Sequence, residues 1–396
     1  MKNLITSKAK EIENKLITHR RYLHENAELG FQTVNTSKYI LETLSALGAE
    51  CSLFSQNMVA GTIKGKNNGK TLLLRADIDA LAISEQTQLE YSCKNGNMHA
   101  CGHDMHASML LGAIEILHGM RESIFGNVKF LFQSAEETLS GARCAINDGI
   151  LDGVDMAMTV HVMVNSEVPT GSVILSFDSP SAPSADFFVI EITGKGCHGS
   201  SPSIGVDPIT CACRIVESLE HIRAYETGIH EKAVITIGTI SGGENANAIP
   251  DKVKLSGTMR CFDEDTRLFC KARFEEIAKG IALAFRCKCE IKYTSECPAL
   301  INNTQMLEKT VGNLEALLGE KNVIRIKDTR SKIQGSEDFA YFSHAVPSVT
   351  VAIAAGSIDK GYVYPLHNPN VIFDEKALNI GCEVLAYNAI KLLEEY

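Results

Sequence analysis

The stretch "HASMLLGAIEILHGMRESIFGNVKFLFQSAEE", residues 106–137, decides the fold class. Its first part, 106–120, predicts a helix, and 126–137 predict a strand that runs into a loop. Segments that predict further strands lie on either side, at 58–65, 70–80 and 156–164. Because strands and helices alternate at this spacing, we expect an α/β domain with a mostly parallel, doubly wound sheet.

Helical patterns flank this region at both ends of the chain. Residues 3–24 place apolar side chains at near-helical spacing and predict one amphipathic helix, and 35–48 predict a second. Near the C-terminus, 347–356 predict a strand and 374–396 a terminal helix. The C-terminal part therefore returns to the α/β pattern.

A Ser/Pro/Ala-rich stretch at 176–186 predicts an interdomain connection. The order after it is strand, helix, strand, strand, helix, strand, which is the ferredoxin-like pattern, over the segments 187–194, 207–224, 233–243, 252–262, 264–285 and 286–294. A second, proline-containing break follows at 295–302. We therefore predict a discontinuous larger domain, 1–183 and 300–396, with a smaller α+β domain inserted at 184–299.

Composition limits the classes of function. A length of 396 residues favours two domains, and a formal net charge of −10 argues against nucleic-acid binding. The longest apolar runs are too short to span a bilayer, and the charged start of the chain lacks the apolar segment of a secretion signal. The 13 cysteines are therefore expected to be reduced thiols. These features predict a cytoplasmic, acidic protein that binds neither nucleic acid nor membranes.

The segment "NMHACGHDMH", residues 97–106, concentrates groups that bind metals. Cys101 and His103 lie two apart where a helix is expected to begin, and Gly102 between them allows the backbone to bend so that both reach one ion. A thiolate and an imidazole suit a borderline divalent ion such as zinc. Cys101 is also a candidate nucleophile with a histidine as its base.

Other metal-binding residue types lie at the predicted ends of other strands. Glu136 and Glu137 follow the strand "VKFLFQS", His161 lies in the apolar strand "MAMTVHVMV", and His367 lies in the loop "PLHNPN". In open α/β sheets, ligands bind at the ends of strands. A metallohydrolase needs one carboxylate to hold metal and another to take a proton from water, and adjacent glutamates on an extended segment point in different directions.

The chain resembles the M20 family of metallopeptidases and amidohydrolases, in particular its hippurate hydrolase and N-acyl-amino-acid amidohydrolase branch. The matching stretches occur in family order and are "RRYLHENAELGFQT", "LLLRADIDAL", "MHACGHDMHASMLLGA", "FQSAEE", "VHV", "GKGCHGSSPSIGVDPI", "NAIPDKVKLSGTMR", "GSEDFAYF" and "HNPNVIFDEKAL". Asp77-Ile-Asp79, and a cysteine at 101 where most relatives have aspartate, point to the amidohydrolase branch.

The resemblance assigns a role to each matching position. Two divalent ions, zinc or manganese with nickel also open, would be held by Cys101 as the bridge and by His103, Glu137, His161 and His367. Glu136 would be the general base, with Asp79 and Asp104 behind the ligands and Asp104 orienting His103. The smaller domain would serve as lid and dimerisation surface and supply His198 to polarise the substrate carbonyl, with Asn247 and Arg260 binding substrate.

These assignments predict an amidohydrolase that cleaves N-acyl amino acids, such as hippurate-like or N-acetyl compounds, with a metal-activated water. The resemblance also implies the partners, which are a small-molecule substrate and a second copy of the chain. Two alternatives stay open at this point, a hydrolase that uses Cys101 as nucleophile and a metal-binding member of the fold without catalysis. The preferred acyl group, the preferred amino acid and the subunit in which His198 acts are open as well.

Overall fold

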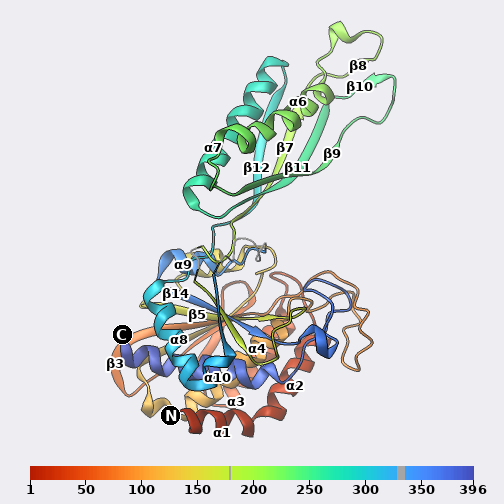
Figure 1. The fold of residues 1–396 in the computed structure, drawn as a ribbon. Helices are drawn as coiled ribbons and strands as arrows, with labels where there is room; N and C mark the ends of the chain where they lie inside the picture. The colour runs from red at the N-terminus through yellow and green to blue at the C-terminus, as the bar shows by residue number, and fades with distance from the viewer. Residues whose placement is uncertain (178–179, 328–334) are drawn as a thin grey trace. The chain divides into compact units, whose positions relative to one another are not determined.

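The computed structural model of the chain describes residues 1–177, 180–327 and 335–396. It divides into two compact units. As far as their residues are described, the first comprises Met1–Ser179, Ile301–Thr329 and Asp338–Tyr396, and the second comprises Pro180–Leu300 and Arg330–Glu337. The predicted boundaries at 183/184 and 299/300 lie beside these limits, but no sequence pattern predicts that 335–337 belong to the second unit. Both chain ends lie in the first unit (Figure 1).

The first unit is built on an eight-stranded sheet with the order β1-β2-β4-β3-β5-β14-β6-β13. Its strands are β1 Cys51–Phe54, β2 Met58–Lys64, β3 Asn67–Asp77, β4 Phe125–Gln133, β5 Met156–Met163, β6 Val173–Ser176, β13 Val323–Ile326 and β14 Ser348–Ala354. The central strands β4, β3, β5 and β14 run parallel, which confirms the predicted sheet. The edge pair β1–β2 is antiparallel, because the short turn Ser55–Asn57 between them leaves no room for a crossover.

Two long buried helices, α4 (His103–Gly119) and α10 (Ala377–Glu395), pack against each other and against β3 (Figure 1). The other helices of this unit are α1 Lys2–Glu11, α2 Glu13–Glu25, α3 Val34–Ala46, α5 Gly141–Asn147, α8 Thr304–Leu318 and α9 Ala340–Ala345. The single helix predicted at 3–24 was wrong: the chain leaves helical geometry at Ile12, with φ −97° and ψ 5°, so that α1 and α2 are separate. Within the described part of the chain, no helix is long and apolar enough to cross a membrane.

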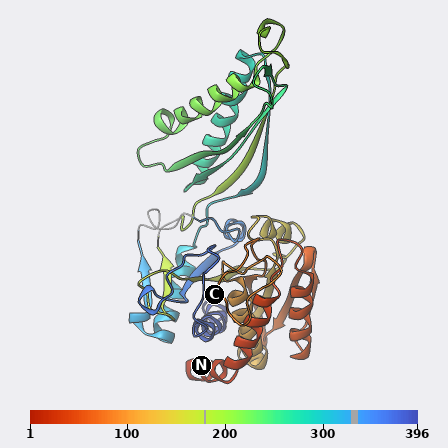
Figure 2. The same ribbon diagram turned by 90° about the vertical axis from the view of Figure 1, so that its right-hand side faces the viewer.

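The second unit has a four-stranded antiparallel sheet with the order β12-β7-β11-β9. Its elements are β7 Ala185–Thr193, β8 Cys197–His198, α6 Pro208–His221, β9 Ala233–Ser241, β10 Ala248–Ile249, β11 Lys252–Cys261, α7 Glu264–Ala284 and β12 Lys288–Cys297. Both helices cover one face of the sheet (Figures 1 and 2), where Phe188 packs against Phe274. This arrangement confirms the predicted ferredoxin-like order.

Candidate metal centre and active site

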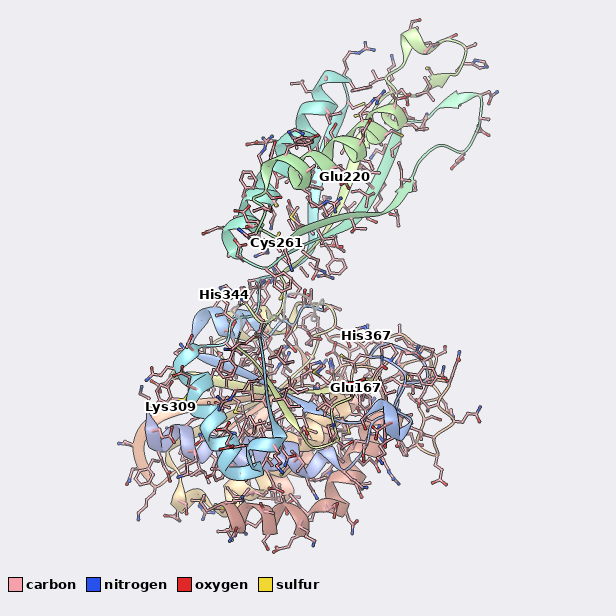
Figure 3. All side chains as sticks on the ribbon, viewed as in Figure 1. Glu167, Glu220, Cys261, Lys309, His344 and His367 are labelled. Atoms are coloured by element: carbon pink, nitrogen blue, oxygen red, sulfur yellow. The ribbon has the colours of Figure 1, made fainter. Side chains whose placement is uncertain are left out.

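The candidate ligands of the first unit lie where its parallel strands end. Glu136 and Glu137 follow β4, His161 lies near the end of β5, and Cys101 and His103 lie at the start of α4. The carboxyl ends of parallel strands share one edge of the sheet, which is where ligands bind in open α/β folds. His367 reaches the same place from the loop between β14 and α10, which appears at the surface in Figure 3.

The donor atoms fall into two groups that share one residue. Those of Cys101, His103 and His161 lie within 4.8 Å of one another, and so do those of Cys101, Glu137 and His367. Cys101 Sγ is buried and lies 3.6 Å from His161 Nε2. A thiolate common to two groups, each with a nitrogen and a third donor, has the composition of a paired site for divalent ions of the zinc type.

His103 offers one ring nitrogen to an ion. Its Nδ1 donates a hydrogen bond to the Asp79 carbonyl at 2.8 Å, which leaves the lone pair on Nε2. Among the described residues, Nε2 is buried without a hydrogen-bond partner, while oxygens of Glu136 and Glu137 lie 3.8 Å away. Burial by itself lowers the pKa of this ring, but the charge of Asp77 raises it well above its ordinary value, so the surroundings favour a positive charge at Nε2. A cation at this point would satisfy the nitrogen and the carboxylates together, so the residues fit a metal.

Asp79 fixes the direction of the two glutamates. Its carboxylate oxygens accept the backbone N–H of Glu136 at 3.0 Å and that of Glu137 at 3.2 Å. The turn just before them needs a positive φ of 60° at Ala135, a strained conformation of the kind found at functional sites. Glu137 then lies 3.7 Å from His367 Nε2, whereas Glu136 accepts the N–H of Asp338 at 3.3 Å. The two carboxylates therefore face different partners.

His161 and His367 are oriented through the backbone. His161 Nδ1 donates to the carbonyl of Val162 at 2.8 Å, so that Nε2 faces Cys101. Removal from water lowers the pKa of His161 to about 3, so the ring is neutral at physiological pH, as a ligand must be. His367 has a φ of +64°, and its N–H donates to the Ala100 carbonyl at 2.9 Å. This bond holds the His367 loop against the Cys101 segment.

Asp104 differs from its predicted role. Its carboxylate lies 2.8 Å from Arg20 Nε and 2.9 Å from His24 Nδ1, and all three side chains are buried. His103 is instead held by Asp79, because the first turn of α4 points Asp104 toward α2. Arg20 and His24 belong to the motif "RRYLHENAELGFQT", so the resemblance marked them without giving them a role.

A buried ionic network that the sequence did not predict lies next to the two glutamates. Arg75 Nη1 lies 2.8 Å from Asp77, and its Nη2 lies 2.6 Å from Asp338. Gln133 Nε2 donates to both carboxylate oxygens of Asp338, at 3.0 and 2.9 Å. Two sequence features could have indicated this network: the charged pair inside the apolar strand "LLLRAD" and the acidic motif "GSEDFAYF".

The predicted residues of the second unit fall into two places. His198 pairs with Ala248 across β8 and β10, and the N–H of Gly199 donates to the Asn247 carbonyl at 2.7 Å, so His198 and Asn247 are neighbours. Arg260 lies near the other end of β11, where its guanidinium donates to Ser336 Oγ at 3.2 Å and covers the Phe187 ring. The eight steps along the strand from Lys252 to Arg260 span about 26 Å.

An α/β sheet that carries grouped thiol, imidazole and carboxylate donors at the ends of its parallel strands defines the class of metal-dependent hydrolases. Comparison with known proteins gives the family. The model of Peptidase family M20/M25/M40 matches residues 73–391, and the chain belongs to this family.

Individual relatives match over almost the whole chain. Thermostable carboxypeptidase 2 of Saccharolobus solfataricus is 35% identical over 96% of both chains. N-acetylcysteine deacetylase of Bacillus subtilis is 33% identical and covers 97% of this chain and 98% of its own. A dinuclear metal-binding peptidase of the M20 family from Bacillus subtilis has a solved structure with a TM-score of 0.81, at 31% identity, over 98% of this chain and all of that one.

Proposed function

We propose that the protein is a metal-dependent amidohydrolase that cleaves the amide bond of N-acyl amino acids and releases a carboxylic acid and a free amino acid. The observation that carries this proposal is the Glu136–Glu137 pair, which Asp79 holds with one carboxylate toward His367 and the other toward Asp338. This arrangement separates a ligand from a base, as hydrolysis by an activated water requires.

The donor set supports two divalent ions per subunit. Cys101, His103, Glu137, His161 and His367 would hold them, with Cys101 common to both. We favour Zn²⁺ because of the thiolate, although Mn²⁺ or Ni²⁺ also accepts imidazole and carboxylate donors. When bound, such ions polarise a carbonyl and make water acidic enough to attack at neutral pH.

The side chains of this chain would handle the proton and orient the substrate. Glu136 takes the proton of the attacking water and delivers it to the nitrogen of the departing amino acid. The hydrogen bond from the Asp338 N–H to Glu136 Oε1 leaves Oε2 on the side of His103, toward the ligands. His198 donates to the oxygen of the scissile carbonyl as negative charge develops on it.

The proposed substrate class is defined by two groups, the amide bond that is cleaved and the free carboxylate of the amino acid that is released. A carboxypeptidase and an N-acetylcysteine deacetylase, the activities for which two relatives are named, both release an amino acid with a free carboxylate. Arg260 is partly buried, and among the residues that the structure describes it contacts the Ser336 hydroxyl and the Phe187 ring. A planar guanidinium in such surroundings is suited to a carboxylate. We assign it to the amino-acid carboxylate, with Asn247 as a further substrate-binding residue.

The positions within the second unit support a homodimer. His198 and Asn247 belong to the part of the chain beyond the Lys252 end of β11, whereas Arg260 lies about 26 Å further along that strand, so we do not expect one N-acyl amino acid to contact all three in one chain. A second copy that supplies His198 and Asn247 removes this conflict. Strand β9 offers a surface for it, since it is an edge strand with Val234 52% and Ile240 55% exposed. The 13 cysteines of the sequence are expected to be reduced thiols, which supports a reducing compartment, and we propose the cytoplasm.

A hydrolase with Cys101 as nucleophile is the main alternative. Its Sγ lies 3.6 Å from His161 Nε2, as a thiol and its base would. However, burial raises the pKa of the Cys101 thiol, and burial lowers that of His161 to about 3, so the pair does not form the thiolate and imidazolium that this chemistry requires. The geometry also surrounds the sulfur with further metal donors.

The decisive test is Glu136→Gln in metal-loaded enzyme, assayed on a panel of N-acetyl, N-benzoyl and indole-acyl amino acids. We expect kcat to fall at least ~100-fold while the metal content is retained, because Gln cannot accept the proton. Glu122→Gln, an exposed change beside the opposite end of β4, is the matched control and should leave kcat unchanged. Full activity of Glu136→Gln would refute the proposal. Hydrolysis that survives a chelator but stops on thiol alkylation would favour the cysteine mechanism instead.

A further inference from the structure

His106 lies fully buried in the first turn of α4, next to the candidate ligands but outside both donor groups that share Cys101. From the sequence alone it has no role beyond packing on the helix face. In the structure it lies between β3 and β5, where the ladder between these two strands stops. The ladder pairs Leu72 with Met156 and reaches Arg75 opposite Thr159.

Beyond that point, His106 provides a hydrogen-bond acceptor for β5. The N–H of Val162, on the part of β5 that continues past the ladder with β3, donates to His106 Nε2 at 2.9 Å. A buried backbone N–H without an acceptor costs free energy of folding. The ring nitrogen supplies the acceptor that a carbonyl of the neighbouring strand would otherwise provide. Because Nε2 accepts, it carries no proton, and the ring proton must lie on Nδ1.

The other side of the ring ties His106 to the end of β3. Nδ1 donates to Asp77 Oδ1 at 2.6 Å, and the second oxygen of Asp77 lies 2.8 Å from Arg75 Nη1. These groups are all buried, so the carboxylate is fixed by the arginine and in turn fixes the ring. A continuous chain of hydrogen bonds therefore runs from Arg75 through Asp77 and His106 to Val162.

Val162 is the point at which this chain meets the metal centre. Its carbonyl accepts the Nδ1 proton of His161, which directs His161 Nε2 toward Cys101. A Cβ on Gly102 would lie 2.3 Å from Val162 Cγ2, so the backbone between Cys101 and His103 rests directly on this side chain. A shift of Val162 would therefore displace three candidate ligands at once.

We propose that His106 is a positioning residue of the metal centre: through its Nε2 it holds the backbone of Val162 and thereby sets the place and the tautomer of the His161 ring. The inference rests on the proposed function only in taking His161 as a ligand. It gives His106 a role toward the metal although its own nitrogens are both used, one by Asp77 and one by Val162.

Two substitutions of His106 test the hydrogen bonds of its two ring nitrogens separately. Glutamine places an amide oxygen near the position of Nε2 and can still accept the Val162 N–H, whereas asparagine reaches only the position of Nδ1 and can serve Asp77 alone. We expect the Zn²⁺ affinity of the metal-free protein, measured by calorimetric titration, to fall about 10- to 100-fold in His106→Asn. His106→Gln should retain most of the wild-type affinity.

The control is Ser108→Ala, which removes another buried hydrogen bond of α4, to the Leu16 carbonyl at 2.7 Å, away from the ligands. It should leave zinc affinity unchanged. Co²⁺ substituted for Zn²⁺ adds a spectroscopic readout, since a displaced His161 alters the visible bands in His106→Asn but not in Ser108→Ala. Equal zinc affinities of the Asn and Gln variants would overturn the proposal, whatever the wild-type enzyme hydrolyses.

A measurement on the unmodified protein covers the case in which neither variant folds. Nitrogen-15 NMR of histidine-labelled, zinc-loaded protein reports which ring nitrogen carries the proton. We expect His106 to be neutral, with the proton on Nδ1 and none on Nε2. A proton on Nε2 would contradict the hydrogen bond from Val162 and with it the positioning role. If the zinc-loaded wild-type protein hydrolyses no N-acyl amino acid, this result would count against the proposed function and not against this inference.

Discussion

Replacement of Gly102 by alanine should damage the metal centre and the first unit together. Gly102 has a φ of +84°, and its new Cβ would lie 2.3 Å from Val162 Cγ2 and 3.2 Å from the Phe373 ring. The left-handed backbone costs a residue with a side chain about 1–2 kcal/mol, and overpacking of a buried site costs about 1–3 kcal/mol more. We therefore expect the variant to lose about 2–5 kcal/mol in free energy of unfolding.

Thermal unfolding of the metal-free protein and calorimetric zinc titration test this estimate. The unfolding midpoint of the first unit should fall by at least about 4 °C, and zinc affinity should fall because Cys101 and His103 flank the changed residue. Gly119→Ala is the matched control at the other end of α4, where a Cβ meets nothing within 4 Å, and it should be neutral or slightly stabilising. A Gly102→Ala protein with wild-type stability and zinc affinity would refute the reasoning.

Three further predictions concern the groups around the ligands. Asp79→Ala frees the N–H groups of Glu136 and Glu137, so zinc affinity measured by titration should fall about 10- to 100-fold, while a wild-type affinity would show that Asp79 does not fix the pair. Arg75→Met leaves buried Asp77 and Asp338 without their cation and should cost ~3–5 kcal/mol in urea unfolding; a loss below 1 kcal/mol, about that of an exposed pair, would contradict this. His24 is the third case: burial lowers its pKa, but Asp104 and Glu85 raise it above the ordinary value of 6.5 overall. A raised pKa stabilises the fold below 6.5, and this contribution is lost as pH rises through the folded-state pKa. His24→Gln should therefore cost more stability in acid than in alkali, and the reverse order in melting experiments would refute the assignment.

The sequence predicted the architecture well because that architecture depends on local patterns. The alternation of apolar strands with helices is enough to predict a parallel sheet, and the six elements between 187 and 294 are enough to predict the ferredoxin-like order. The break at Ile12 escaped prediction because apolar spacing continues across it. The short strands β6 and β13 were also missed, since four residues carry too little pattern to be recognised.

The candidate site was predictable only in part. The residue types at Cys101, His103, Glu136, Glu137, His161 and His367, with the family motifs, indicated a metal centre. The role of His106 depends on a backbone N–H of β5 that has no partner in β3, and that of Asp338 depends on Arg75 of β3 and Gln133 of β4, so both appear only after these strands are assembled. Asp104 was assigned to its neighbour in sequence, His103, although its partners Arg20 and His24 come from a helix far away in the chain.

The position of β14 has a consequence for synthesis of the chain. This strand, Ser348–Ala354, lies between β5 and β6 in the sheet, although the whole second unit is translated before it. The segment Pro180–Leu300 can fold on the ribosome as soon as it emerges, because its sheet is complete within it. Until β14 is translated, the place between β5 and β6 in the sheet of the first unit stays empty. Helix α10, which packs against β3, is translated later still. During that interval the unfinished sheet exposes unpaired strand edges of the kind that favour aggregation.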